Sequence, residues 1–282
     1  RELYVDFDFN LDNGHIISTR LGKQQVIWGR TDLFRVLDVI NPVDYSRNNI
    51  YDELEDIRIP MWILKTDYRM GATETFDDLN LQLIWNFDRF RPNDLGQCGQ
   101  PNVIVDAGCF FRGMNNLWEN GGTVANFAGG VAATDFGPGQ IGIRQANLPN
   151  WSLSNTQVGL KFEGVLGDLG FSLNALSYRS QMPSIRGGIE AQNGFTGEVA
   201  VWPALIAFDI DFPRVTLLGG SMDYYSQGID TVFRVEAAHT SGEEFANTLR
   251  SELFSESDVL RYVIGADKNI FIPYEIYKSI IR

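Results

Sequence analysis

Charged and amide side chains stand at every second position in several stretches of this sequence. They are Lys65, Asp67 and Arg69, Asn80 and Gln82, Lys161 and Glu163, and Arg234 and Glu236. Successive side chains of a β-strand point to opposite faces, so each set would share one face of its strand. In a sheet rolled into a barrel, that face lines a wet lumen, where rings of charge select among ions. The mixed signs predict weak selectivity, and the alternative is the solvent face of a soluble sheet.

The residue patterns of common enzyme sites are missing or wrongly arranged. Acidic residues cluster at Asp52, Glu53, Glu55 and Asp56, and again at Glu243 and Glu244. A glycosidase needs two carboxyl groups that face each other across the substrate, about 5–10 Å apart, whereas helical neighbours lie side by side. The two histidines, His15 and His239, accompany no G-x-S-x-G motif and no metal-ligand spacing. We therefore expect no catalytic residue, no metal and no cofactor.

The two cysteines, Cys98 and Cys109, lie in the segment GQCGQPNVIVDAGCFF. Their spacing would close a small ring, and an oxidising compartment would allow a disulfide between them. The alternative is two unpaired thiols. A zinc site is not expected there, because both histidines are distant in sequence.

Composition favours a β-rich protein that does not bind nucleic acid. The 282 residues include 28 glycines, and 44% are hydrophobic and 12% aromatic, which is typical of strands and turns. A formal net charge of −13 leaves nothing to neutralise a run of phosphates. The sequence has no run of about 18 apolar residues, so we expect no transmembrane helix, although a β-barrel needs none.

Alternation of apolar and polar residues predicts the strands that would position these side chains. The expected strands are residues 2–9, 15–28, 61–70, 79–88, 155–166, 169–178, 213–225, 231–240 and 259–266. With a further strand pattern at the C-terminal end of the sequence, we count about ten strands. Short turns and long connections join them alternately. Aromatic residues at strand ends, such as Trp85 and Phe87, fit a membrane interface or, equally, the core of a soluble sandwich. In the barrel interpretation the lipid-facing residues are Trp62, Leu64, Leu81, Leu83, Trp85, Phe162 and Phe233.

Long excursions interrupt the strands at residues 30–60, 90–155, 180–211 and 242–257. We predict short helical pieces within them, at residues 31–39, 48–57 and 242–257. Between the first two pieces, Asn41-Pro42-Val43-Asp44 is a rigid break, because Pro42 fixes its own φ and disfavours a helical Asn41. We expect this segment to fold against the sheet wall or into a lumen, with a structural role.

The first excursion and its flanking strands carry a family resemblance. The residues concerned are Gly22, Gln24, Val26, Trp28, Gly29, Ile40, Asn41, Pro42, Val43, Asp44, Ile59, Pro60, Met61 and Trp62. Together they resemble the DUF1302 family, and residues 260–267 give a second, weaker match. The resemblance implies an outer-membrane β-barrel of Gram-negative bacteria. Genes of this family often lie beside those of large efflux-type transporters. It also marks Trp28, Gly29, Asn41, Pro42 and Asp44 as a structural motif.

We therefore predict an all-β protein, an antiparallel transmembrane β-barrel with long loops carrying short helices. Residues 1–282 would form one barrel domain, expected to be a fragment of a longer chain. Its expected role is a channel or transport component that passes a solute, apolar solutes included, through the bacterial outer membrane. Its expected partners are outer-membrane lipid and, by the resemblance, an inner-membrane transporter or a periplasmic protein. The alternatives are a β protein that binds a ligand or partner through its long loops, and a secreted carbohydrate hydrolase.

Overall fold

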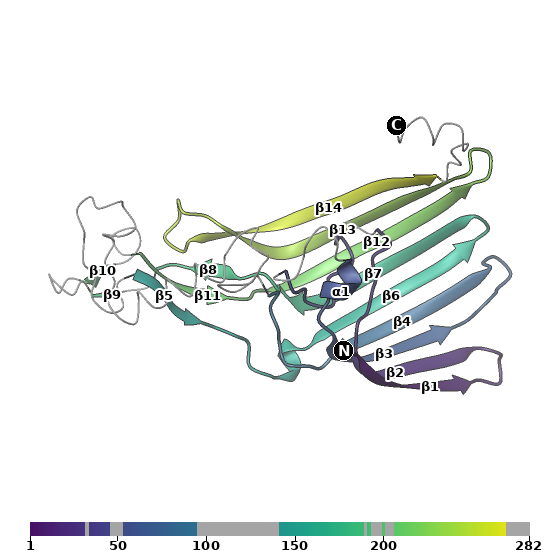
Figure 1. Cartoon of the computed structure of the whole chain (residues 1–282), viewed down its shortest axis with the longest axis horizontal. Coiled ribbons are helices and arrows are strands. Elements are labelled where there is room, and N and C mark those ends of the chain that lie inside the picture. The colour runs from purple at the N-terminus through teal and green to yellow at the C-terminus, as the bar shows by residue number, and fades with distance from the viewer. Residues whose placement is uncertain are drawn as a thin grey trace, which may run out of the picture.

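The computed structural model describes residues 1–31, 34–45, 53–94, 141–188, 191–192, 199–200 and 206–268. Its main element is a nine-stranded antiparallel sheet in which each strand pairs with the next along the chain (Figure 1). The strands are β1 (Leu3–Asn10), β2 (Ile16–Gln24), β3 (Met61–Arg69), β4 (Asp78–Asn86), β6 (Gln157–Leu166), β7 (Leu169–Arg179), β12 (Arg214–Ser226), β13 (Thr231–Ala246) and β14 (Phe254–Lys268). The predicted all-β antiparallel architecture is thus confirmed. The sheet is open in the described part of the chain, with β1 and β14 as its edges, so the predicted barrel closure is not seen.

Two smaller sheets lie beyond one end of the main sheet (Figure 1). One contains β5 (Ile141–Ala146), β11 (Ile206–Asp211) and β8 (Ser184–Arg186), in that order. The other pairs β9 (Ala191–Gln192) with β10 (Val199–Ala200). Helical structure among the described residues is limited to α1 (Leu54–Ile57) and the 3-10 turn η1 (Leu153–Asn155).

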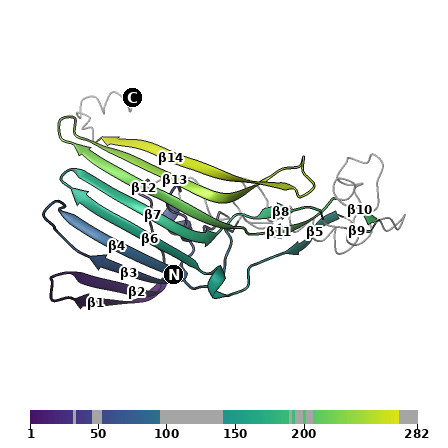
Figure 2. The same ribbon diagram turned by 180° about the vertical axis from the view of Figure 1, so that it is seen from behind.

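Short and long connections alternate between the two ends of the main sheet. The turns that follow β1, β3, β6 and β12 lie at one end, whereas β2, β4 and β7 end, and β3, β6 and β12 begin, at the other end (Figure 2). The tightest is the turn between β6 and β7, where only Gly167 and Asp168 separate the strands and Gly167 has a φ of +57°. All of the elaborate structure therefore belongs to one end.

The predicted helix at residues 242–257 is wrong. Strand β13 continues to Ala246 and β14 begins at Phe254, so only the connecting tip lies outside the sheet. The register between these strands shifts between Thr240 and Glu243, and Gly242 has a φ of +80°. Such a bulge inserts one residue and reverses the alternation from that point on.

Of the other two predicted helices, one is wrong and the other is confirmed where it is described. In the described part of residues 31–39 there is no helix. Here the Arg35 guanidinium donates hydrogen bonds to the carbonyls of Asp38 (2.8 Å) and Asn41 (2.7 Å), which holds the chain in an irregular conformation. In the piece predicted at residues 48–57, α1 (Leu54–Ile57) confirms the described part, and residues 48–52 lie outside the described residues.

One face of the main sheet is mainly apolar along its nine strands. A row of register partners near the strand midpoints runs through Phe7, Thr19, Thr66, Leu83, Leu160, Ala175, Leu218, His239 and Leu260. Many of these side chains are uncovered: Leu83 is 46% exposed, Leu160 45% and Leu218 58%. The residues predicted to face lipid all lie on this side, which we call the apolar face.

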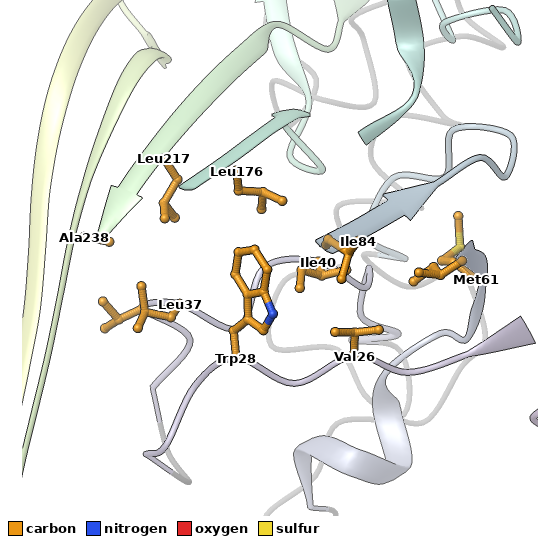
Figure 3. Close-up of a cluster of buried hydrophobic side chains, with 11 residues drawn as sticks. Val26, Trp28, Leu37, Ile40, Met61, Ile84, Leu176, Leu217 and Ala238 are labelled. Carbon is orange, nitrogen blue, oxygen red and sulfur yellow. The ribbon is translucent and has the colours of Figure 1, made fainter. Parts of the chain in front are cut away.

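The buried core lies on the opposite side, which we call the polar face. There the chain between β2 and β3 folds back over the sheet, and we call residues 25–31 and 34–43 the inner segment. It contributes Val26, Trp28, Val36, Leu37 and Ile40 to the core, and the strands contribute Met61, Ile63, Ile84, Leu176, Leu217 and Ala238 (Figure 3). The excursion thus folds against the sheet, as expected from its sequence.

Gly159 on β6 makes room for the largest of these side chains, Trp28. A Cβ at this position would lie 2.6 Å from Trp28 Cη2, 2.7 Å from Leu176 Cδ1 and 2.9 Å from Ile84 Cγ1. Replacing Gly159 with alanine should therefore lower the free energy of unfolding by about 1–3 kcal/mol through overpacking. Urea unfolding of the purified protein measures this change. Gly265→Ala is the matched control, because nothing lies within 4 Å of its added Cβ. Equal stability of the two variants would contradict the packing argument.

Candidate functional site: the polar face and the inner segment

The predicted lumen-facing residues all lie on the polar face. One row across the sheet contains Asp67, Gln82 and Lys161, and the next contains Arg69, Asn80 and Glu163 and continues through Ser172 and Ser221 to Glu236. Lys65 is two residues from Asp67 on β3, and Arg234 is two residues from Glu236 on β13. Antiparallel register partners share a face, so the period-two pattern and the pairing agree on a single surface.

A hydrogen-bonded network joins these side chains across β3, β4 and β6. Lys65 Nζ lies 3.4 Å from the Asp67 carboxylate, and Gln82 Nε2 donates to that carboxylate at 2.7 Å. Asn80 Nδ2 donates to both Asp67 and Glu163, each at 3.1 Å. Lys161 Nζ completes the network at 2.6 Å from Glu163. Asp67, Gln82 and Lys161 are buried, so their polar atoms are stabilised mainly by these contacts.

The inner segment adds an aromatic residue and a cation to this network. Trp28 Nε1 donates a hydrogen bond of 2.7 Å to Gln82 Oε1, while its ring lies in the core. The Arg30 guanidinium forms an ion pair with Asp223 on β12, and it lies 3.8 Å from the Glu163 carboxylate on β6. Residues 28 to 30 therefore connect three strands of the sheet through side chains alone.

Glu236 on β13 holds the backbone of the same segment. Its Oε1 accepts hydrogen bonds from the backbone N–H groups of Arg30 and Thr31, the latter at 2.8 Å. The Glu236 residue is fully buried. A carboxylate that accepts two backbone N–H groups is well suited to fix the position of an irregular segment.

Sequence reasoning missed Arg30 and Asp223, which join the inner segment to β12. Asp223 follows Leu217, Gly219 and Ser221 at alternate positions, so extending the alternation along β12 would have placed it on the polar face. Gly170 on β7 leaves room for this carboxylate, because an added Cβ would lie 2.7 Å from Asp223 Oδ2. No signal in the sequence predicts that Arg30 would reach it.

The motif residues that carry the family resemblance hold the inner segment in place. The buried Asn41 side chain accepts a hydrogen bond from Val26 N (2.8 Å) and donates to the carbonyls of Gln24 (3.1 Å) and Ile59 (3.0 Å). The Pro42 carbonyl accepts from Ile59 N at 2.8 Å. Next to Gly29, Asp38 forms a buried ion pair with Arg58 at 2.7 Å. These contacts join the inner segment to β2 and to the residues just before β3.

The other residues considered from the sequence do not converge on a site. His15 Nδ1 lies 2.6 Å from the Tyr68 hydroxyl, and His239 lies on the apolar face of β13. Glu243 and Glu244 pair with separate arginines, Arg261 and Arg186. Cys98, Cys109 and Asp52 lie outside the described residues. Within the described ranges no three His, Cys, Asp or Glu side chains are grouped to hold a metal ion. The described helices are also too short or too polar to cross a membrane.

Together these features define an open, antiparallel β-meander with one apolar face and one polar face, the latter covered by a segment of its own chain. The model of the DUF1302 family, described as a protein of unknown function, matches residues 1–271. The chain therefore belongs to the DUF1302 family. A search of curated proteins and a search of solved structures each returned no match.

Proposed function

We propose that this chain forms part of the wall of an outer-membrane β-barrel that passes a solute. In this proposal the apolar face contacts lipid and the polar face lines a wet lumen. The observation that carries it is the separation of the two faces over nine consecutive strands. On the polar side, the chain supplies its own cover. On the apolar side, side chains such as Leu160 and Leu218 have none. A transmembrane barrel needs this arrangement, because lipid-facing and lumen-facing residues alternate along each of its strands.

The directions of the strands indicate how such a barrel would be completed. In an antiparallel sheet of nine strands, both edge strands, β1 and β14, run in the same direction. Joining them directly would create a parallel pair, whereas bacterial outer-membrane barrels are antiparallel and have an even number of strands. A second copy in the same membrane orientation would offer edges that run in that same direction. We therefore propose that an odd number of further strands, each antiparallel to its neighbours, completes the wall.

The proposed passage runs along the polar face, beside the inner segment. The charges there have mixed signs, which favours weak selectivity over binding of one ion. Apolar solutes remain among the candidates, and the proposed partners are an inner-membrane transporter or a periplasmic protein. We do not propose catalysis, because the described carboxylates Glu163 and Asp223 both engage Arg30 instead of facing an open cleft.

Conductance across a planar lipid bilayer tests this function. The full-length protein that contains this chain, purified and refolded in detergent, should migrate faster on a gel before boiling than after, as closed barrels do, and should insert into the bilayer with discrete conductance steps. Boiled protein is the control and should give no steps. Full-length protein that is monodisperse in water without detergent, and gives no conductance, would contradict the proposal.

A second candidate function is a docking protein that uses the elaborate end of the sheet. Arg186 on β8 pairs with Glu244 on β13 at 2.5 Å, and its guanidinium lies 4.2 Å from the centre of the Phe254 ring on β14. These contacts fix the small sheet of β5, β11 and β8 to the long β13–β14 hairpin. A water-soluble, non-conducting protein that retains this fold would favour docking over transport.

A further inference from the structure

We infer that Arg30 sets the ion selectivity of the proposed passage, as a tethered cation that neutralises carboxylates of the wall. The inference rests on the proposed function and names the residue on which selectivity depends. Without the Arg30 charge, the polar face would favour the passage of small cations. With that charge in place, the passage discriminates little between cations and anions.

Carboxylates from three strands converge on Arg30 and its neighbour Thr31. Asp223 on β12 and Glu163 on β6 approach the Arg30 guanidinium, and Glu236 on β13 accepts from the backbone. The side chains of Arg30, Asp223 and Glu163 are 32%, 29% and 25% exposed, respectively. The three charged groups therefore lie at a water-accessible wall, where a passing ion would experience their field.

Asp223 depends on Arg30 more than Glu163 does. Lys161 lies 2.6 Å from Glu163, so that carboxylate keeps a counter-charge without Arg30. Among the described residues, the ion pairs of Asp223 involve Arg30 alone, because Arg234, its register partner on β13, pairs with Asp267 at 2.6 Å. Removal of the Arg30 charge thus leaves one uncompensated negative charge on the wall.

The position of Asp223 is built into the neighbouring strand. Gly170 is the register partner of Asp223 on β7, and an added Cβ there would lie within 3.0 Å of three atoms of the carboxylate. The absent side chain lets Asp223 extend over β7 towards β6, which is where Arg30 and Glu163 meet. The cluster of Arg30, Asp223 and Glu163 therefore depends on β6, β7 and β12 together with the inner segment.

The contacts that hold the inner segment do not require the guanidinium. Trp28 is held by Gln82 and the core, and Glu236 binds the backbone N–H groups of residues 30 and 31. Arg30→Gln keeps those contacts and removes only the charge. Its effect on selectivity can thus be separated from an effect on folding.

Reversal potentials under a KCl gradient test the inference. For Arg30→Gln we expect the ratio of K⁺ to Cl⁻ permeability to rise about two- to fivefold, since one uncompensated charge at about 4 Å corresponds to about fivefold in water. Asp223→Asn should shift the ratio towards Cl⁻, and the double variant should return close to the starting protein. Arg250→Gln is the matched control, because it makes the same charge change at an exposed position on the hairpin tip and should leave the ratio unchanged.

The outcomes separate the inference from the function on which it rests. If the Arg30→Gln protein conducts and its reversal potential is unaltered, the role of Arg30 is overturned and the proposed channel function stands. Absence of conductance in every variant, including the starting protein, would overturn both. If Arg30→Gln fails to fold, as judged by gel migration before and after boiling, Asp223→Asn decides, and an unaltered potential in that variant refutes the inference.

Discussion

Replacing Arg58 with methionine should lower the free energy of unfolding by about 3–5 kcal/mol, because it leaves a buried carboxylate without its partner. Arg58 Nε donates to Asp38 Oδ2 at 2.8 Å, and a second guanidinium nitrogen lies 2.7 Å from the same oxygen. The side chains are only 7% and 2% exposed. The nearest remaining cation, Arg35, lies 3.7 Å away and already bonds backbone carbonyls. Asp38 Oδ1 has no partner even with Arg58 present, so the loss cannot be absorbed locally.

A double variant separates the loss of the pair from the burial of an orphaned charge. Asp38→Leu combined with Arg58→Met replaces both charges by apolar side chains, a change that is often neutral or even stabilising for buried pairs. We therefore expect the double variant to be more stable than Arg58→Met alone, as measured by urea unfolding in detergent. Arg69→Met is the control, because Arg69 is exposed and its loss should cost less than about 0.5 kcal/mol. If Arg58→Met lowers the free energy of unfolding by less than about 1 kcal/mol, the pair does not anchor the inner segment. The same conclusion follows if the double variant is less stable than Arg58→Met.

This ion pair also illustrates what the sequence could and could not predict. The strands could be predicted because alternation is a local property. In β4, for example, Leu81 and Leu83 flank Gln82, and the pairing places the leucines on the apolar face and the glutamine opposite. The same rule correctly grouped Lys161 with Glu163 and Arg234 with Glu236. Residues two apart on a strand share a face whatever the tertiary structure.

The candidate site depends on contacts that no local pattern encodes. Arg30 and Asp223 are separated by 193 positions, and Arg30 and Glu236 by 206. The sequence predicted that the excursion would lie against the sheet, because a proline and an amide fix its backbone. It did not predict which wall residues the inner segment would touch. The choice follows from the space left by glycines: Gly159 admits the Trp28 ring and Gly170 admits the Asp223 carboxylate.

The errors in helix prediction have a related cause. The stripe of Phe245, Leu249, Leu253 and Phe254 has helical spacing, yet a strand, a turn and another strand contain it. Phe245 lies near the end of β13, Leu249 and Leu253 lie in the connecting tip, and Phe254 begins β14. Periodicity in a single sequence cannot distinguish such an arrangement from a helix, because positions four apart match one helical face whatever structure joins them.

The sequence and the pairing agree most fully on the apolar face, and a charge placed there provides the sharpest test of the membrane assignment. Leu160→Arg introduces a guanidinium near the middle of β6, in a row with Leu83 and Leu218. If this face contacts lipid, the variant should lose about 2–4 kcal/mol of unfolding free energy, the cost of arginine near the bilayer midplane. If the face contacts water, a leucine that is already 45% exposed should tolerate the change at a cost within about 0.5 kcal/mol.

The measurement compares urea unfolding of refolded protein in phospholipid vesicles for matched arginine variants. Leu249→Arg is the control, because Leu249 is 95% exposed at the tip of the β13–β14 hairpin, beyond the proposed lipid contact, and should be unaffected. Leu218→Arg should reproduce the loss from a different strand, since it occupies the same row. If the Leu160→Arg and Leu218→Arg proteins are as stable as the Leu249→Arg protein, the apolar face lies in water. The basis for a lumen on the other side is then removed. If Leu160→Arg and Leu218→Arg both lose stability and Leu249→Arg does not, contact with lipid explains the uncovered apolar face of the nine strands.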